Sequence, residues 1–145
     1  MIGVLVRKAR AALDVAVAAT AVARARRMVA RRPVGSLVGR SLGAQVPDVV
    51  ERLSATDRQQ GERWGAAVDR ALRWIPGDAA CLVRASALRD LLLIHGLPRA
   101  DVRIGVRRGT AGFEAHAWVE QDGIPIAEPV ALQGAFSSLD GVTLR

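Results

Sequence analysis

The chain has 145 residues, half of them hydrophobic and 24% charged, which fits one ordinary domain with a compact core and excludes a disordered or low-complexity protein. Its single cysteine excludes an intramolecular disulfide, and with only two histidines we expect no metal site and no cofactor. The formal net charge is +7, but residues 1–40 alone carry +8, so the basic character belongs to the first quarter of the chain.

Residues 4–31 contain no glycine or proline and consist mainly of Ala, Val, Leu and Arg, which predicts a long helix. Small and aliphatic residues can share one face of this helix, followed by a basic stripe at helical spacing: Ile2, Leu5, Ala9, Leu13, Ala16 and Thr20, then Arg24, Arg27 and Arg31. Either the helix packs on the domain through small residues and leaves its charges in solvent, or it docks on an acidic partner. A membrane surface or a nucleic acid is the remaining alternative.

The N-terminal region also bears on localisation. Its uncharged stretch, residues 15–23, is shorter than the ~18 residues that a membrane-spanning helix needs, so we expect no membrane span. A signal peptide is the alternative, because basic residues precede an Ala/Val-rich run. Asp14 interrupts that run and the helical composition continues to Ala30, so the sequence favours a cytoplasmic protein.

Glycines and prolines are concentrated in residues 33–47, which therefore read as a connector. We divide the chain there into residues 1–46, the basic N-terminal helix with its connector, and residues 47–145, the core domain.

Three further helices are expected in the first half of the core domain. A short helix over residues 47–53 leads to a capping box at residues 56–59, which opens a helix that ends near Trp74. The apolar face of that helix consists of Trp64, Val68, Ala71, Leu72 and Ile75. Asp78 is the expected N-cap of the next helix, which stops at residues 96–98 and places Cys81 in its first turn.

The hydrophobic period then changes from helical to two, which predicts strands. Residues 102–106 and 113–120 form the first two strands, and residues 124–128 form a third after Asp122-Gly123. Residues 142–144 are a candidate edge strand. The expected fold class is α+β, with helices packed on a small antiparallel sheet.

Cys81 is the candidate nucleophile, because unpaired N–H groups and the positive end of the dipole stabilise a thiolate in the first turn of a helix. The alternative is a small buried hydrophobic residue. His95 is fourteen residues further along the same expected helix, ~21 Å away, and is too distant to be the base. His116 is the remaining candidate base, on a strand face that it shares with Trp118, although it could be an ordinary partly buried polar residue.

The group that orients His116 depends on the hairpin after its strand. A three-residue loop at residues 121–123 places Glu128 opposite His116 and on the same face. A two-residue Asp122-Gly123 turn shifts the register by one, turns Glu128 away and leaves Asp122 as a weaker substitute. The expected constellation is Cys81 as nucleophile, His116 as general base and acid, and Glu128 as the carboxylate that orients His116.

These segments resemble the transglutaminase-like cysteine protease of lasso peptide biosynthesis, the leader peptidase. The resemblance covers about residues 70–130 and rests on Trp74-Ile75-Pro76, on Cys81-Leu82-Val83-Arg84-Ala85, on residues 102–106 and on residues 113–120. It implies a papain/transglutaminase-like core in which the nucleophile helix packs on the sheet and adjacent strands supply the histidine and the acid. Cys81 and His116 match this pattern directly, whereas Glu128 stands where Asp is usual.

The resemblance also implies a reaction and its partners. The precursor peptide would be hydrolysed between leader and core, which frees the core amine for a separate ATP-dependent macrolactam synthetase. A leader-recognition protein, known as a RiPP recognition element, would present the leader. Residues 1–70 contain no strand pattern for such an element, so we expect it to be a separate chain. The basic helix or the strand edge with Arg103, Arg107 and Arg108 could dock it, and no nucleic acid is expected.

Three residues are candidates for substrate binding. Trp74 and Trp118 would wall the cleft or pack in the core, and Arg84 would bind substrate or neutralise a buried carboxylate. The backbone N–H of Cys81 is the candidate oxyanion donor. A transglutaminase-type acyltransferase would use the same three catalytic residues, and a non-catalytic partner-binding module is the further alternative.

Overall fold

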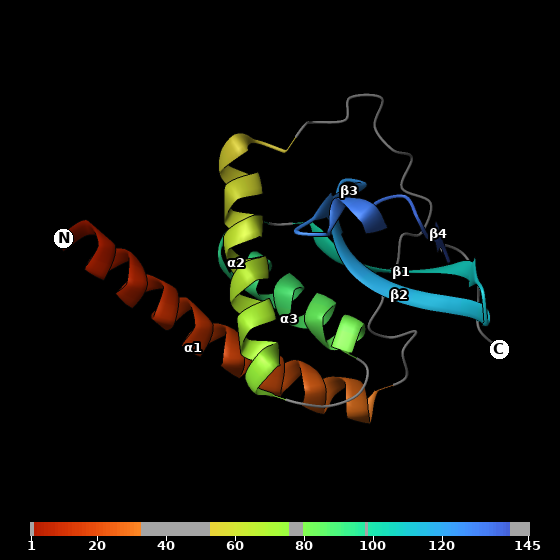
Figure 1. Ribbon diagram of the computed structural model, residues 1–145, viewed down its shortest axis with the longest axis horizontal. Coiled ribbons are helices and arrows are strands. Elements are labelled where there is room, and N and C mark those ends of the chain that lie inside the picture. Colours follow the sequence, from red (N-terminus) through yellow and green to blue (C-terminus); the bar gives the residue numbers. More distant parts are fainter. Residues whose placement is uncertain (1, 33–52, 76–79, 98, 140–145) are drawn as a thin grey trace.

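The computed structural model describes residues 2–32, 53–75, 80–97 and 99–139 (Figure 1). In chain order the elements are α1 (Ile2–Arg31), α2 (Ala55–Trp74), α3 (Ala80–Ile94), β1 (Ala100–Gly109), β2 (Gly112–Gln121), β3 (Ile124–Ile126), a short 3₁₀ helix (Val130–Leu132) and β4 (Ser137–Ser138). The expected α+β class, with a small antiparallel sheet, is confirmed.

Several expectations fall on residues outside the described ranges. These are residues 47–52 of the short helix, the N-cap at Asp78, the edge strand at residues 142–144 and the division between residues 46 and 47. Within the described ranges, none of the helices combines the length and the apolar character that a bilayer crossing requires.

The start of α2 differs from the expected capping box at residues 56–59. The cap is Ser54, whose hydroxyl accepts a hydrogen bond from the Asp57 N–H at 3.0 Å. Both registers offer a hydroxyl followed three residues later by a polar side chain, so the pattern alone could not separate them. The end of the helix at Trp74 is confirmed.

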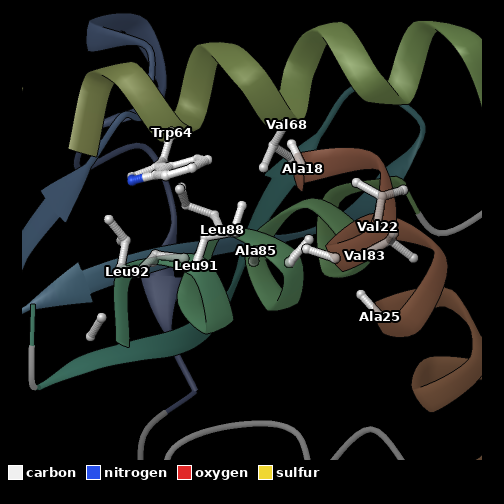
Figure 2. Close-up of a cluster of buried hydrophobic side chains, with 14 of the residues drawn as sticks. Ala18, Val22, Ala25, Trp64, Val68, Val83, Ala85, Leu88, Leu91 and Leu92 are labelled. Atoms are coloured by element: carbon white, nitrogen blue, oxygen red, sulfur yellow. The ribbon is translucent and has the colours of Figure 1, made fainter. Parts of the chain in front are cut away.

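The core lies on both sides of α3. Figure 2 shows Leu88, Leu91 and Leu92 of α3 beside Trp64 and Val68 of α2, with Ala18 and Val22 of α1 in the same cluster. Residues of the sheet complete this cluster: Ala100, Val102, Ala117, Val119 and Ile126. The helix that begins next to Cys81 is therefore held between two other helices and the sheet.

The packed face of α1 is not the face on which the sequence gathers its larger aliphatic residues. Ala18, Val22 and Ala25 are buried, whereas Leu5 and Leu13 are 72% and 66% exposed. Small side chains allow a close approach of α1 to α2 and α3, and this close packing decides which face turns inward. The aliphatic stripe of α1 therefore points to solvent.

Asp14 fixes α1 to α2. Arg63 of α2 donates from Nε to Asp14 Oδ2 at 2.7 Å and from Nη2 to Oδ1 at 2.5 Å. The hydrogen bonds from Arg63 lower the pKa of Asp14 below its ordinary 3.8, although burial acts in the opposite direction. Because the folded pKa is lowered, the stability from this pair is present above about pH 4 and is lost as the pH falls through the folded value.

We therefore expect Asp14→Asn to lower the free energy of unfolding by about 1–3 kcal/mol at pH 7, since it removes a charge-assisted bidentate pair. The difference from the parent protein should shrink as the pH falls below about 4. Urea unfolding at several pH values measures this. Asp101→Asn is the control, because that carboxylate is half exposed and lies 3.8 Å from Arg89. Equal stability of parent and Asp14→Asn at pH 7 would contradict the expectation.

The sheet has the strand order β3-β2-β1-β4, and all its described pairs are antiparallel. In β1 and β2, Val102 pairs with Val119 and Gly105 with His116. Strand β3 is shorter than expected, and β4 was not expected at its position. The sheet thus carries His116 on the central strand β2, one strand from the edge that β3 forms.

Candidate active site

Cys81 lies in the first turn of α3, as the sequence predicts. Its side chain is partly buried and packs against the hydrophobic core. The N–H groups of a first turn have no partner within the helix, and the positive end of the helix dipole lies there. Cys81 therefore lies at the N-terminal end of α3.

His116 is held by a buried carboxylate. Its Nε2 lies 2.5 Å from Oε1 of Glu128, whose side chain is only 3% exposed. The imidazole ring also faces the rings of Trp118 and Phe136, at centroid distances of 6.1 and 5.2 Å. Glu128 and two aromatic rings thus restrict the orientation of the imidazole.

The contact between His116 and Glu128 arises by a route that differs from the one expected. The hairpin pairs Val119 with Ile126, with a two-residue turn at Asp122 and Gly123, so the three-residue loop is wrong. Both turn residues have positive φ, 51° and 79°, as a type I′ turn requires.

Glu128 nevertheless reaches His116, because strand alternation ends before it. β3 stops at Ile126, and Ala127 adopts a left-handed φ of 50°. This conformation redirects the chain, so the register rule that turns Glu128 away no longer applies to it. Asp122, the weaker substitute, is instead paired with Arg99 at 2.9 Å.

Arg84 balances the charge of Glu128. It donates from Nε to Asp69 Oδ1 at 2.6 Å, from Nη2 to the carbonyl oxygen of Ala127 at 2.8 Å, and from Nη1 to Glu128 Oε2 at 3.4 Å. Burial acts to lower the pKa of Arg84, but the hydrogen bond and charge of Asp69 and the charge of Glu128 outweigh it, and the pKa is raised. Of the two alternatives for Arg84, these contacts favour neutralisation of a buried carboxylate.

Asp69 and Gly65 were not singled out from the sequence, although both support this arrangement from α2. A Cβ atom at Gly65 would overlap the Cβ of Ala127, so the glycine permits α2 to approach the residue that redirects Glu128. An isolated glycine within a helical pattern is a signal for such an approach. No comparable signal marks Asp69, because its partner Arg84 belongs to another helix.

Arg84 of α3 and His116 of β2 both contact Glu128. Arg84 follows Cys81 by three residues, a spacing that places two side chains on the same side of a helix. Among the described residues no hydrogen bond joins the thiol to His116, whose side chain points to the sheet face opposite Ala117 and Val119. Since Glu128 occupies Nε2, Nδ1 is the ring nitrogen left for a thiol. A direct contact between the Cys81 thiol and His116 is thus a proposal.

A cavity of about 540 Å³ opens next to Glu128. Its polar wall includes Asp69, Arg84 and Glu128, and its apolar wall includes Ile126 and Val130. The network that holds His116 is thus accessible from one side through a space large enough for a side chain of a bound peptide.

The model of the transglutaminase-like superfamily matches residues 9–140 of this sequence. The chain belongs to this superfamily. The match takes in most of α1 and all the described elements after it. No curated protein and no solved structure matches the chain. The superfamily includes cysteine proteases and acyltransferases and usually carries a Cys-His-Asp set, whereas the carboxylate that contacts His116 in this chain is a glutamate.

The two tryptophans proposed for substrate binding have different surroundings in this superfamily domain. Trp74 ends α2 and is 83% exposed, whereas Trp118 is 8% exposed. The indole N–H of Trp118 donates to Glu120 Oε1 at 2.7 Å, and its ring covers Gly105, where a Cβ would lie 2.7 Å from the ring. These contacts show that Trp118 packs on the sheet, and a role in substrate binding remains a prediction for both residues.

His95 is separate from this group. It follows the end of α3, is exposed and stacks on Trp64 with the ring centroids 4.3 Å apart. In the described part of the chain, no three His, Cys, Asp or Glu side chains stand close enough to bind a metal ion.

Proposed function

We propose that this chain is a cytoplasmic cysteine protease that removes the leader from a lasso peptide precursor, together with a separate leader-recognition protein. The observation that carries the proposal is the 2.5 Å contact of His116 with the buried Glu128, on a domain that places its single cysteine at the start of a helix. A carboxylate that fixes one ring nitrogen is the arrangement that a histidine base needs. The resemblance of residues 70–130 to the leader peptidase supports the choice of substrate.

The proposed reaction is hydrolysis through a thioester. The Cys81 thiolate attacks the scissile carbonyl carbon, and the backbone N–H of Cys81 donates to the developing oxyanion. His116 gives its Nδ1 proton to the leaving amine, so the core peptide departs with a free N-terminus. A water molecule then loses a proton to His116 and attacks the thioester, which releases the leader acid and restores the thiolate. Glu128 stabilises the imidazolium in both steps.

The freed N-terminal amine determines the next reaction of the core peptide. A macrolactam synthetase would join this amine to a side-chain carboxylate of the core, in a reaction that needs ATP. The protease itself requires no cofactor for its own two steps. Its specificity would come mainly from the recognition protein, which presents the leader, and Trp74 and Trp118 would contribute contacts to the substrate.

The test is to incubate the precursor with the recognition protein and this chain and to weigh the products. We expect two fragments, leader and core, whose combined mass exceeds that of the precursor by one water. A condensed product that has lost ammonia would show an acyltransferase instead and would overturn the proposal. Leader removal in the pathway that persists at full rate with Cys81→Ala would point to a non-catalytic binding module.

A further inference from the structure

The outward face of α1 combines exposed aliphatic and basic residues. Leu5, Leu13 and Val17 are exposed, and Leu13 points away from the buried Val22, since nine residues correspond to half a rotation of a helix. Figure 1 shows the N-terminal half of α1 (red) extending beyond α2 and α3. Within the described residues, neither helix covers this aliphatic stripe.

The same face becomes basic toward the end of the helix. Arg27 and Arg31 are exposed and follow Leu13 by fourteen and eighteen residues, which places both within about 40° of its direction. From Leu5 to Arg31 the face is about 39 Å long at ~1.5 Å per residue. Asp14 is the one acidic residue of α1, and Arg63 engages it, so the outward face carries only positive charge.

We propose that this face of α1 docks a partner protein whose surface is aliphatic opposite Leu5–Val17 and acidic opposite Arg24–Arg31. The partner is the leader-recognition protein, an assignment that rests on the proposed function. Docking there would bring the leader and the protease domain together without any contact of the partner with Cys81, His116 or Glu128.

Charge argues against the other two occupants of the face. A second copy of the chain would bring cations together in either direction, because a parallel pair aligns Arg24–Arg31 with itself and an antiparallel pair aligns it with Arg7, Lys8 and Arg10. A helix at a bilayer surface keeps its cations beside the apolar face, in the headgroups. On α1, however, Arg31 lies in line with Leu13. If the aliphatic face of α1 were buried in a bilayer, the guanidinium of Arg31 would therefore point toward the acyl chains.

The test measures binding of the purified recognition protein, loaded with leader peptide, to the full chain carrying Cys81→Ala. Arg24→Glu/Arg27→Glu and Leu13→Gln should each weaken binding about tenfold or more, because exposed anchors at the centre of an interface dominate affinity. The matched controls are Arg70→Glu/Arg73→Glu, two exposed arginines at the same spacing on α2, and Ile94→Gln, an exposed aliphatic residue on α3. Each control should stay within about twofold of the parent. Circular dichroism of every variant checks that it folds.

Failure of this proposal is distinguishable from failure of the protease proposal. Binding that is absent, or unchanged by the α1 variants, overturns the docking site even if the precursor is cleaved. Binding that the α1 variants weaken supports the docking site even if the precursor is not cleaved. Sedimentation of the parent protein and of the α1 variants with phosphatidylglycerol vesicles tests the membrane alternative. The proposal is also overturned if the α1 variants lose vesicle binding but bind the recognition protein as the parent does.

Discussion

Replacement of Cys81 by alanine is expected to lower the rate of leader removal by about 10⁴-fold or more, the largest effect of any single substitution in the chain. The proposed reaction passes through a thioester, and the chain has no second cysteine to form one. Loss of a nucleophile in an enzyme of this kind leaves only the contribution of binding and oxyanion contacts. Mass spectrometry of precursor, leader and core over time gives the rate.

The same experiment must separate lost chemistry from lost folding. Cys81 is partly buried, and its replacement by alanine removes one atom from the edge of the core, so we expect little change in thermal unfolding. Because the thiol is unique, iodoacetamide modifies one site, and the rate of this reaction reports on the thiol directly. Alkylation should be slower in His116→Ala if the imidazole meets the thiol. An unchanged alkylation rate together with full activity of Cys81→Ala would contradict the proposed chemistry.

The elements of the fold follow from local sequence more closely than their packing does. Alanine-rich composition predicts the helix α1, but both of its faces are apolar, and only contacts with distant residues select the face of Ala18 and Val22 over that of Leu13. Arg63, the partner of Asp14, is 49 residues away in the chain. Periodicity gives no information about such a pair.

In the candidate site, too, local features could be predicted from the sequence, whereas contacts between distant residues could not. The first turn of α3 and the strand of His116 could be predicted from capping and alternation, which act over a few residues. The contact of Glu128 with His116 could not be predicted from the true hairpin register, which turns Glu128 away. The contact depends on a left-handed alanine at position 127. Alanine rarely adopts that conformation, and here the close approach of Gly65 from α2 accompanies it. The tertiary arrangement, rather than local preference, brings the acid to the histidine.

Glu128→Gln is expected to lower kcat for leader removal by about 10²–10⁴-fold, the second largest effect that we expect. Glutamine has nearly the same shape, so the packing of the buried side chain is kept, but the negative charge that stabilises the imidazolium is lost. The amide also offers N–H donors where the carboxylate only accepts. An amide donor facing Nε2 would fix the proton of neutral His116 on Nδ1, and this tautomer cannot accept a proton from Cys81.

Two variants and one spectroscopic measurement test this argument. Glu128→Asp keeps the charge and restores the acid that is usual in the superfamily, so it should recover much of the activity despite its shorter side chain. Glu120→Gln is the matched control, because Glu120 lies on the same face of β2 and accepts its hydrogen bond from Trp118 rather than from His116. Nitrogen NMR of His116 should show the protonated nitrogen change from Nε2 to Nδ1 in Glu128→Gln, a change that a purely structural role would not produce. Full activity of Glu128→Gln, with the tautomer of His116 unchanged, would remove Glu128 from the mechanism. The contacts of Glu128 with Arg84 and His116 would then be structural only.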